Sequence, residues 1–228
     1  GLAFGGLWIK RRIDQLENPE HFLGIVQWVM GLVAVGTVFF YNHCFNLMEG
    51  LMNGVARTGE GYFLFNVGSN LIAALVMFPA AFCAGMTLPL ITLSLLKRGV
   101  GESSIGTVYG VNTLGAIVGV LFSTHIGLPL LGLKGLICLG ALVDIGLGCA
   151  LFWRSGGKRY MGSQRLFAIG TIVVLIFAIG VEFDSLKMAS GVYRNGSLAD
   201  PDEAKVIYHK DGKTATIAVS DWAETRLI

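Results

Sequence analysis

The sequence is dominated by long segments that contain almost no ionisable side chain. Residues 22 to 48 include no Asp, Glu, Lys or Arg, and the same holds for residues 61 to 96 and 103 to 133. A helix needs roughly 20 mainly apolar residues to cross the hydrocarbon core of a bilayer. Each of these runs is long enough, so the pattern predicts membrane-spanning helices.

Further runs extend this pattern along the chain. Residues 135 to 153 are interrupted only by Asp144, residues 166 to 181 are apolar, and residues 1 to 9 resemble the end of one more span. Only 14% of the chain is charged, against about 25% in soluble domains. We therefore expect an all-α polytopic membrane helix bundle with five whole spans and one truncated span. The lipid bilayer is its first expected partner.

The third run contains two prolines, Pro79 and Pro89. Because proline lacks a backbone N–H and clashes with the preceding turn, the sequence predicts a bent or broken helix there. The basic residues are scattered over short loops and form no patch, which argues against a nucleic-acid partner.

Basic residues are distributed unequally between the two sets of loops. Two basic residues, Arg57 and Lys134, lie in one set of alternate loops. Since basic loops stay on the cytoplasmic side, the asymmetry predicts that the other set is cytoplasmic and that the tail is periplasmic in a bacterial inner membrane. That other set holds nine basic residues, namely Lys10, Arg11, Arg12, Lys97, Arg98, Arg154, Lys158, Arg159 and Arg165.

The composition changes after residue 182, where a polar tail begins. Residues 204 to 209 and 214 to 220 are rich in β-forming side chains, and they flank Lys210-Asp211-Gly212-Lys213. An Asp-Gly pair between two such runs is a strong hairpin signal, because glycine tolerates positive φ. A third strand is expected to begin at Thr225. We therefore divide the chain into a transmembrane bundle, residues 1–182, and the start of an extramembrane β-domain, residues 183–228.

Two polar residues within the apolar runs are candidates for an intramembrane site. Asp144 is the only formal charge well inside a span, where an isolated carboxylate is costly unless it is protonated, paired or hydrated. One role that fits Asp144 is contact with a proton, a cation or a substrate. The other is that of a neutral acid hydrogen-bonded to a neighbouring helix. Asn112 fits either a hydrogen bond across a helix contact or the lining of a ligand cavity.

The helix around Asn112 also carries glycines at four-residue spacing. Gly106 and Gly110 form one pair, and Gly115 and Gly119 form another. Small residues at this spacing let membrane helices approach closely. The four glycines therefore predict packing against another helix, either of this chain, of a second copy, or of a different membrane protein.

The sequence contains no recognisable catalytic, cofactor-binding or metal-binding motif. Its four cysteines are far apart, and its four histidines have no metal-ligand spacing. No glycine-rich nucleotide loop or nucleophile elbow occurs. From these residues we predict no catalytic, cofactor or metal site within the chain.

Several stretches together resemble the membrane-embedded spermidine synthase-like proteins, a family often described as fused major-facilitator/spermidine synthase. The resemblance covers nearly the whole chain in order. It is carried by GLAFGGLWIKRRID (1 to 14), CAGMTLPLITLSLLKRG (83 to 99), IGTVYGVNTLGAIVGVL (105 to 121), LPLLGLKG (128 to 135), MASGVYRNG (188 to 196) and VIYHKDGKTATIAVS (206 to 220).

This resemblance implies that the chain is a fragment covering the transmembrane part and the first hairpin of the synthase-like domain. The strands would continue beyond residue 228 into a β-domain and then a doubly wound α/β domain. In true aminopropyltransferases that later domain binds decarboxylated S-adenosylmethionine as substrate and activates an amine acceptor. None of those residues lies in residues 1–228.

Three functions remain open from the sequence. The first is a membrane-anchored, polyamine aminopropyltransferase-type protein whose catalytic domain lies beyond this chain, a transferase of polyamine biosynthesis. The second is a non-catalytic membrane scaffold subunit of a larger complex, supported by the packing glycines. The third is a small-solute transporter, supported by Asp144, Asn112 and the proline-containing run.

Overall fold

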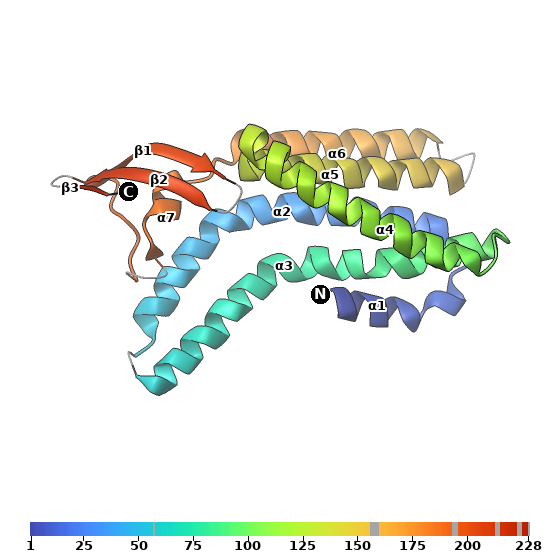
Figure 1. The fold of residues 1–228 in the computed structure, drawn as a ribbon, viewed down its shortest axis with the longest axis horizontal. Coiled ribbons are helices and arrows are strands. Elements are labelled where there is room, and N and C mark those ends of the chain that lie inside the picture. Colours follow the sequence, from blue (N-terminus) through green and yellow to red (C-terminus); the bar gives the residue numbers. More distant parts are fainter. Residues whose placement is uncertain (57, 156–159, 193–195, 213–214, 223–224, 228) are drawn as a thin grey trace.

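The computed structural model describes residues 1–228 except 57, 156–159, 193–195, 213–214, 223–224 and 228. A bundle of long helices leads into a small antiparallel sheet at one end (Figure 1). The helices are α1 (Leu2–Lys10), α2 (Pro19–Gly54), α3 (Gly59–Lys97), α4 (Ser103–Phe122), α5 (Leu128–Ser155), α6 (Tyr160–Gly180) and α7 (Ser185–Ala189). A 3₁₀ turn covers Ile13–Gln15, a π-helical turn covers Ser123–Gly127, and the strands are β1 (Ala204–Asp211), β2 (Thr216–Trp222) and β3 (Thr225–Leu227).

In the described part of the chain, three helical stretches are long and apolar enough to cross a membrane. They are Pro19–Gly54, Gly59–Lys97 and Ser103–Arg154, and a shorter apolar helix covers Arg165–Gly180. Non-helical backbone at Gly132 (φ 67°, ψ 178°) divides the third stretch into two legs. The fourth and fifth predicted runs are therefore two legs of one helical stretch, bent two residues before the expected boundary. The predicted fold class, an all-α membrane bundle with a short C-terminal hairpin, is confirmed.

Helix α2 lies at the centre of the bundle and contacts α3, α5 and α6. Against α5 it packs through glycine: a methyl group at Gly31 would come within 2.7 Å of the Ala141 carbonyl oxygen, and one at Gly148 within 2.8 Å of the Gly24 carbonyl oxygen. The buried side chains form three clusters along α2, and the third of them (Phe45, Met48, Val192) lies at the end near the sheet. The other two lie within the bundle. One joins α1, α2 and α3 (Ile9, Leu23, Val26, Cys83, Met86, Leu90), and the other joins α2, α5 and α6 (Val35, Cys138, Ala141, Ile145, Cys149, Val174).

Many large apolar side chains on the outside of the helices are exposed. Leu71 is 65% exposed, Leu130 is 77% exposed and Ile179 is 78% exposed. In water so much exposed apolar surface would drive association. Among acyl chains it carries no such penalty, so this surface fits a protein whose helices are surrounded by lipid.

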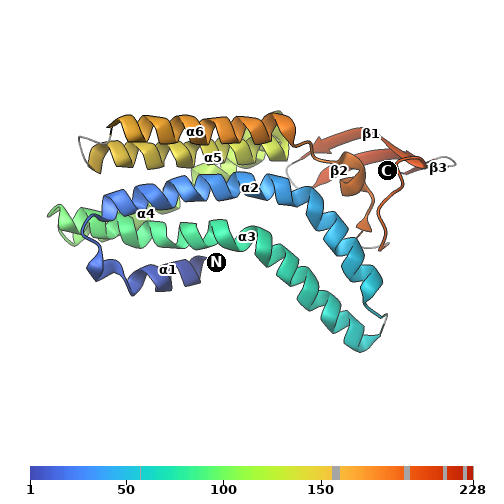
Figure 2. The same ribbon diagram turned by 180° about the vertical axis from the view of Figure 1, so that it is seen from behind.

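Helix α3 bends near its middle, as the prolines predict (Figures 1 and 2). Pro79 lies one residue after the midpoint of Gly59–Lys97, and Pro89 lies further into the C-terminal half. Both α2 and α3 exceed the length that the bilayer core requires, so their connected ends project as an arm on the side of the sheet. Thr58 caps the start of α3, where its side chain accepts a hydrogen bond from the Gly61 N–H (3.2 Å).

The C-terminal strands form a meander in the order β1-β2-β3. In β1 and β2, Asp211 pairs with Thr216 next to the turn, and the register shifts between Val206 and Tyr208. The Gly212 N–H donates to the Ala215 carbonyl (3.1 Å) within that turn. The predicted hairpin and the predicted third strand are both present.

The sheet lies at the opposite end of the bundle from the connections between α1 and α2 and between α3 and α4 (Figures 1 and 2). Those two connections carry Lys10, Arg11, Arg12, Lys97 and Arg98. Basic loops and sheet thus occupy opposite ends, as the alternation of charge along the sequence predicts.

Candidate functional site

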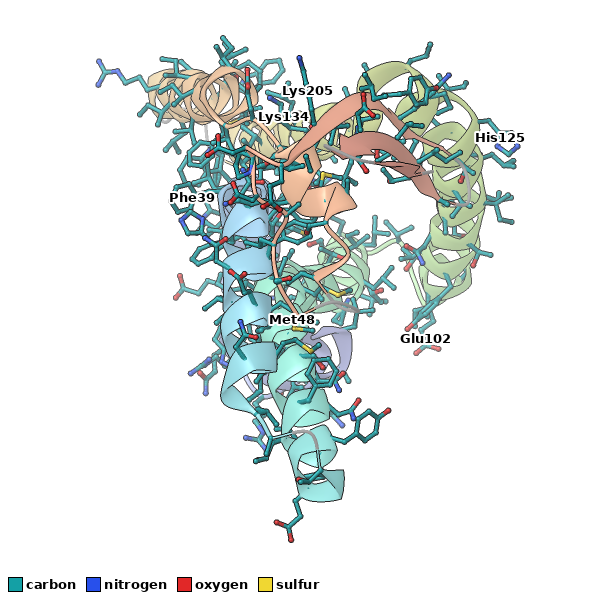
Figure 3. The ribbon with its side chains drawn as sticks, turned by 90° about the vertical axis from the view of Figure 1, so that its left-hand side faces the viewer. Phe39, Met48, Glu102, His125, Lys134 and Lys205 are labelled. Carbon is teal, nitrogen blue, oxygen red and sulfur yellow. The ribbon has the colours of Figure 1, made fainter. Side chains whose placement is uncertain are left out.

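The most developed polar arrangement in the structure is the junction where the sheet meets the bundle. We use the name junction for the contacts that join α2 and α5 to residues 181–222. Here β1 packs beside α5, and α7 packs beside both strands and α2. Figure 3 views this end of the molecule, with Lys134 of α5 at the strands and Met48 of α2 below α7.

Asp211 attaches the hairpin to the bend of the helical bundle. Its Oδ2 accepts a hydrogen bond from the Leu133 backbone N–H (2.9 Å), and its Oδ1 accepts one from the Thr216 hydroxyl (2.8 Å). The Leu133 N–H is available because Gly132 adopts a positive φ that interrupts the helical ladder. Bonds to an ionised carboxylate are about twice as strong as neutral ones. The last residue of β1 therefore satisfies the backbone at the helix bend.

The segment that follows α6 is held against α2 and α5 by three further side chains. The Asn42 amide donates from Nδ2 to the Glu182 carbonyl (2.6 Å) and accepts at Oδ1 from the Asp184 N–H (3.2 Å). Lys134 Nζ donates to the Val181 carbonyl (2.8 Å). Glu49 Oε1 accepts from the Leu198 N–H (2.9 Å), which fixes the chain ahead of β1. Together these contacts restrict how the sheet can move relative to the membrane.

A cavity of about 190 Å³ lies between α2, α7 and the sheet. Polar side chains reach it from four elements: Tyr41 from α2, Lys187 from α7, His209 from β1 and Thr216 from β2. His209 Nε2 is buried and has no hydrogen-bond partner among the described residues. The sequence analysis did not select His209, because nothing in its neighbourhood along the chain reveals that it lines a cavity shared with α2 and α7.

Asp144 lies at the α2–α5 contact rather than facing lipid. A methyl group at Gly31 would come within 3.3 Å of its Cβ. Gln27 precedes Gly31 by one helical turn on the same side of α2, and its Oε1 is buried without a partner in the described part of the chain. The structure thus places the predicted carboxylate at a helix–helix contact, and it shows a buried amide on α2 that the sequence analysis did not select.

Asn112 and the glycines of α4 lie elsewhere. Asn112 is exposed, and so are its neighbours Val111 (63%), Leu114 (65%) and Val118 (65%). A methyl group at Gly106, Gly110, Gly115 or Gly119 would have no atom within 4 Å. Figure 3 shows α4, between the labelled Glu102 and His125, to one side of α2, although α4 also contacts α3. These glycines therefore do not pack against a helix within the described part of the chain, and packing against another protein stays a prediction.

The described part of the chain contains no cluster of metal-binding side chains or thiols. No group of three His, Cys, Asp or Glu side chains there is placed to hold a metal ion. Cys44, Cys83, Cys138 and Cys149 form no disulfide with one another, and the last three are buried.

These features define the chain as a multi-pass helical membrane protein with a sheet attached at one end of its bundle. No known protein family, no curated protein and no solved structure matches the chain.

Proposed function

We propose that this chain is the membrane anchor of a spermidine synthase-like protein and that it holds the first strands of an extramembrane domain against one face of the bilayer. The observation that carries the proposal is the junction, where the Asp211 carboxylate, the Asn42 amide and the Lys134 ammonium all bond to backbone across the bundle–tail boundary. A flexible tether would need none of these bonds. An anchor that orients a domain requires them.

The order of the motifs along the chain supports the family part of this proposal. Residues 83 to 99 form the end of α3 and the loop after it, residues 105 to 121 lie within α4, and residues 206 to 220 belong to the hairpin. These three stretches of the resemblance therefore correspond to separate structural units.

In the proposed reaction a deprotonated amine attacks the carbon beside the sulfonium of decarboxylated S-adenosylmethionine. A C–N bond forms, the C–S bond breaks, and the thioether leaves with both electrons of that bond. The carboxylate that orients the amine accepts its proton. We assign these groups to residues beyond Ile228, and we assign positioning of the domain to the residues described above.

We further propose that the protein resides in a bacterial inner membrane with the sheet on the periplasmic side. The support is the position of the α1–α2 and α3–α4 connections, which carry Lys10, Arg11, Arg12, Lys97 and Arg98, at the end of the bundle opposite the sheet. An accessible cysteine at Lys205, which is exposed on β1, tests this orientation. An impermeant maleimide should label Lys205→Cys in intact cells, and labelling only after lysis would reverse the assignment.

The enzymatic proposal is tested on the full-length protein in its own membranes. Vesicles of both orientations are supplied with decarboxylated S-adenosylmethionine and putrescine, and aminopropyl transfer is measured. Transfer in vesicles that expose the sheet supports the proposal. No transfer in either orientation, together with co-purification of other membrane subunits, would leave the scaffold function instead.

Transport is a second candidate, favoured by the Asp144 carboxylate at the α2–α5 contact and by the buried Gln27 Oε1, which has no hydrogen-bond partner among the described residues. A carboxylate within a membrane can receive a cation or a proton. Ion-coupled uptake into vesicles should then be lost in Asp144→Asn. Uptake equal to that of the unaltered protein would exclude this role for Asp144.

A further inference from the structure

An apolar groove runs along the surface where α2 and α3 meet, next to α1. Its volume is about 500 Å³, and the side chains of Phe22, Val29 and Val33 line it from α2. From α3 it is lined by Phe78 and Met86. All ten of its lining residues lack a charged side chain. It opens outward, since Val29 is 37% exposed and Phe78 is 42% exposed.

The groove is about as long, measured along α2, as one leaflet of the hydrocarbon core is thick. It extends along α2 from Phe22 to Val33, which at 1.5 Å per residue is about 17 Å. Half of a typical hydrocarbon core of roughly 30 Å is about 15 Å. The groove therefore begins near the start of α2, at the basic end of the bundle, and ends near the middle of the bilayer.

A continuous path of contacts joins the outer end of the groove to a cation. The Arg12 guanidinium lies over the Trp8 ring, 4.0 Å from its centroid. The Trp8 ring in turn stacks on Phe22, with the two ring centroids 6.4 Å apart. Phe22 lines the groove. A molecule in the groove would thus carry its polar end beside Arg12.

Arg12 is the last of three consecutive cations in the sequence. Lys10, Arg11 and Arg12 are exposed, and no carboxylate of the described residues forms an ion pair with them. Nearby, the acid Glu20 is already paired with Arg98. Asp14 and Glu17 lie in the same loop and reduce the net positive charge without cancelling it, because Lys97 also reaches this loop and donates to the Leu16 carbonyl (2.5 Å).

From this geometry we infer that the groove binds one anionic phospholipid of the leaflet at the basic end, with an acyl chain against α2 and α3 and its phosphate beside Arg12. The apolar lining excludes a polar occupant. The leaflet-length depth matches an acyl chain, and the cations match an anionic headgroup. The inference depends on the bundle alone and is independent of any transferase activity.

The test measures lipid binding to the full chain by native mass spectrometry, with phosphatidylglycerol and phosphatidylcholine as the two probes. The unaltered protein should retain phosphatidylglycerol more tightly. Because one cation near the membrane surface contributes about a fivefold factor in affinity, Arg12→Gln should weaken phosphatidylglycerol by about fivefold and leave phosphatidylcholine unchanged. Val29→Trp should fill the groove and weaken both lipids.

Two control variants match these changes. Lys205→Gln removes an exposed cation at the sheet end, and Val143→Trp enlarges an exposed valine on α5 outside the groove. Neither should alter binding of either lipid. Equal retention of the two lipids by the unaltered protein would overturn the inference, as would a Val29→Trp protein that binds like Val143→Trp. Disulfide cross-linking between copies through Val29→Cys would show that a second copy occupies the groove instead.

Discussion

Replacing Asp211 by alanine should release the hairpin from the bend at Gly132 in α5. The carboxylate makes two hydrogen bonds of 2.9 and 2.8 Å, one to the Leu133 N–H across the junction and one to the Thr216 hydroxyl within the hairpin. Only the first crosses the boundary between bundle and tail. The effect on docking therefore comes from that bond.

The magnitude follows from the chemistry of the bond. A hydrogen bond to a charged group contributes about 1.5–3 kcal/mol, and removing one partner leaves the other without compensation. Every 1.4 kcal/mol is a factor of ten, so the closed state of the Leu133 amide should become about 10- to 150-fold less populated relative to the open state. The other junction contacts are made by different side chains and should keep the tail attached.

Hydrogen–deuterium exchange of the protein in nanodiscs measures this change directly. The Leu133 amide should exchange about 10- to 150-fold faster in Asp211→Ala, because its protection reports the local opening equilibrium. The amide hydrogens of β1 should also exchange faster, but less so, since the strand pairing to β2 is retained. Asp211→Asn keeps one acceptor oxygen, so its Leu133 amide should exchange at a rate between those of the unaltered protein and Asp211→Ala.

Asp202→Ala is the matched control. Asp202 is an exposed acid in the turn before β1, and its carboxylate forms no ion pair with the described part of the bundle. Its replacement should leave Leu133 exchange unchanged. If the Leu133 amide exchanged equally slowly in Asp211→Ala and in the unaltered protein, the carboxylate would not be what holds the hairpin to the bend, and the proposed role of the junction would fail.

Three further substitutions test the packing and the junction. Gly148→Ala places a methyl group 2.8 Å from a backbone oxygen of α2 and should cost about 1–3 kcal/mol in unfolding from detergent, whereas Gly140→Ala, with no atom within 4 Å, should be neutral. Asn42→Ala should speed amide exchange at the start of α7 about tenfold, and the exposed Asn46→Ala one turn later should not. Gly132→Ala forces a side chain onto a positive φ and should lower the melting temperature through a cost of about 1–2 kcal/mol.

Some of the fold is predictable from local sequence because the physical cause is local. Helices that cross a bilayer must be apolar for about 20 residues, so hydropathy finds them without knowledge of their neighbours. An Asp-Gly turn between β-forming runs is local in the same way, which is why the hairpin at Asp211 was anticipated. The boundary near Gly132 was placed within two residues because Lys134 interrupts the apolar sequence there.

The candidate sites depend on contacts that no local pattern records. Nothing within ten residues of Asp211 indicates that its carboxylate reaches Leu133, 78 positions away. Gln27 lies in an apolar run and was passed over, and only the packing of the bundle buries its Oε1. The glycines of α4 show the converse, since their spacing predicts a partner helix that the described part of this chain does not supply.

The sequence by itself determined that the chain is a membrane bundle, where its helices lie, and that basic loops and polar tail belong to opposite ends. Those properties follow from transferring individual side chains between water and lipid, which depends on composition along the chain. Only the tertiary structure decided that the tail is bonded to the bundle, that His209 is covered and that an apolar groove leads to Arg12. Those properties depend on which helices become neighbours. That choice is made by side-chain packing between segments that are far apart in the sequence, so a local pattern does not reveal it.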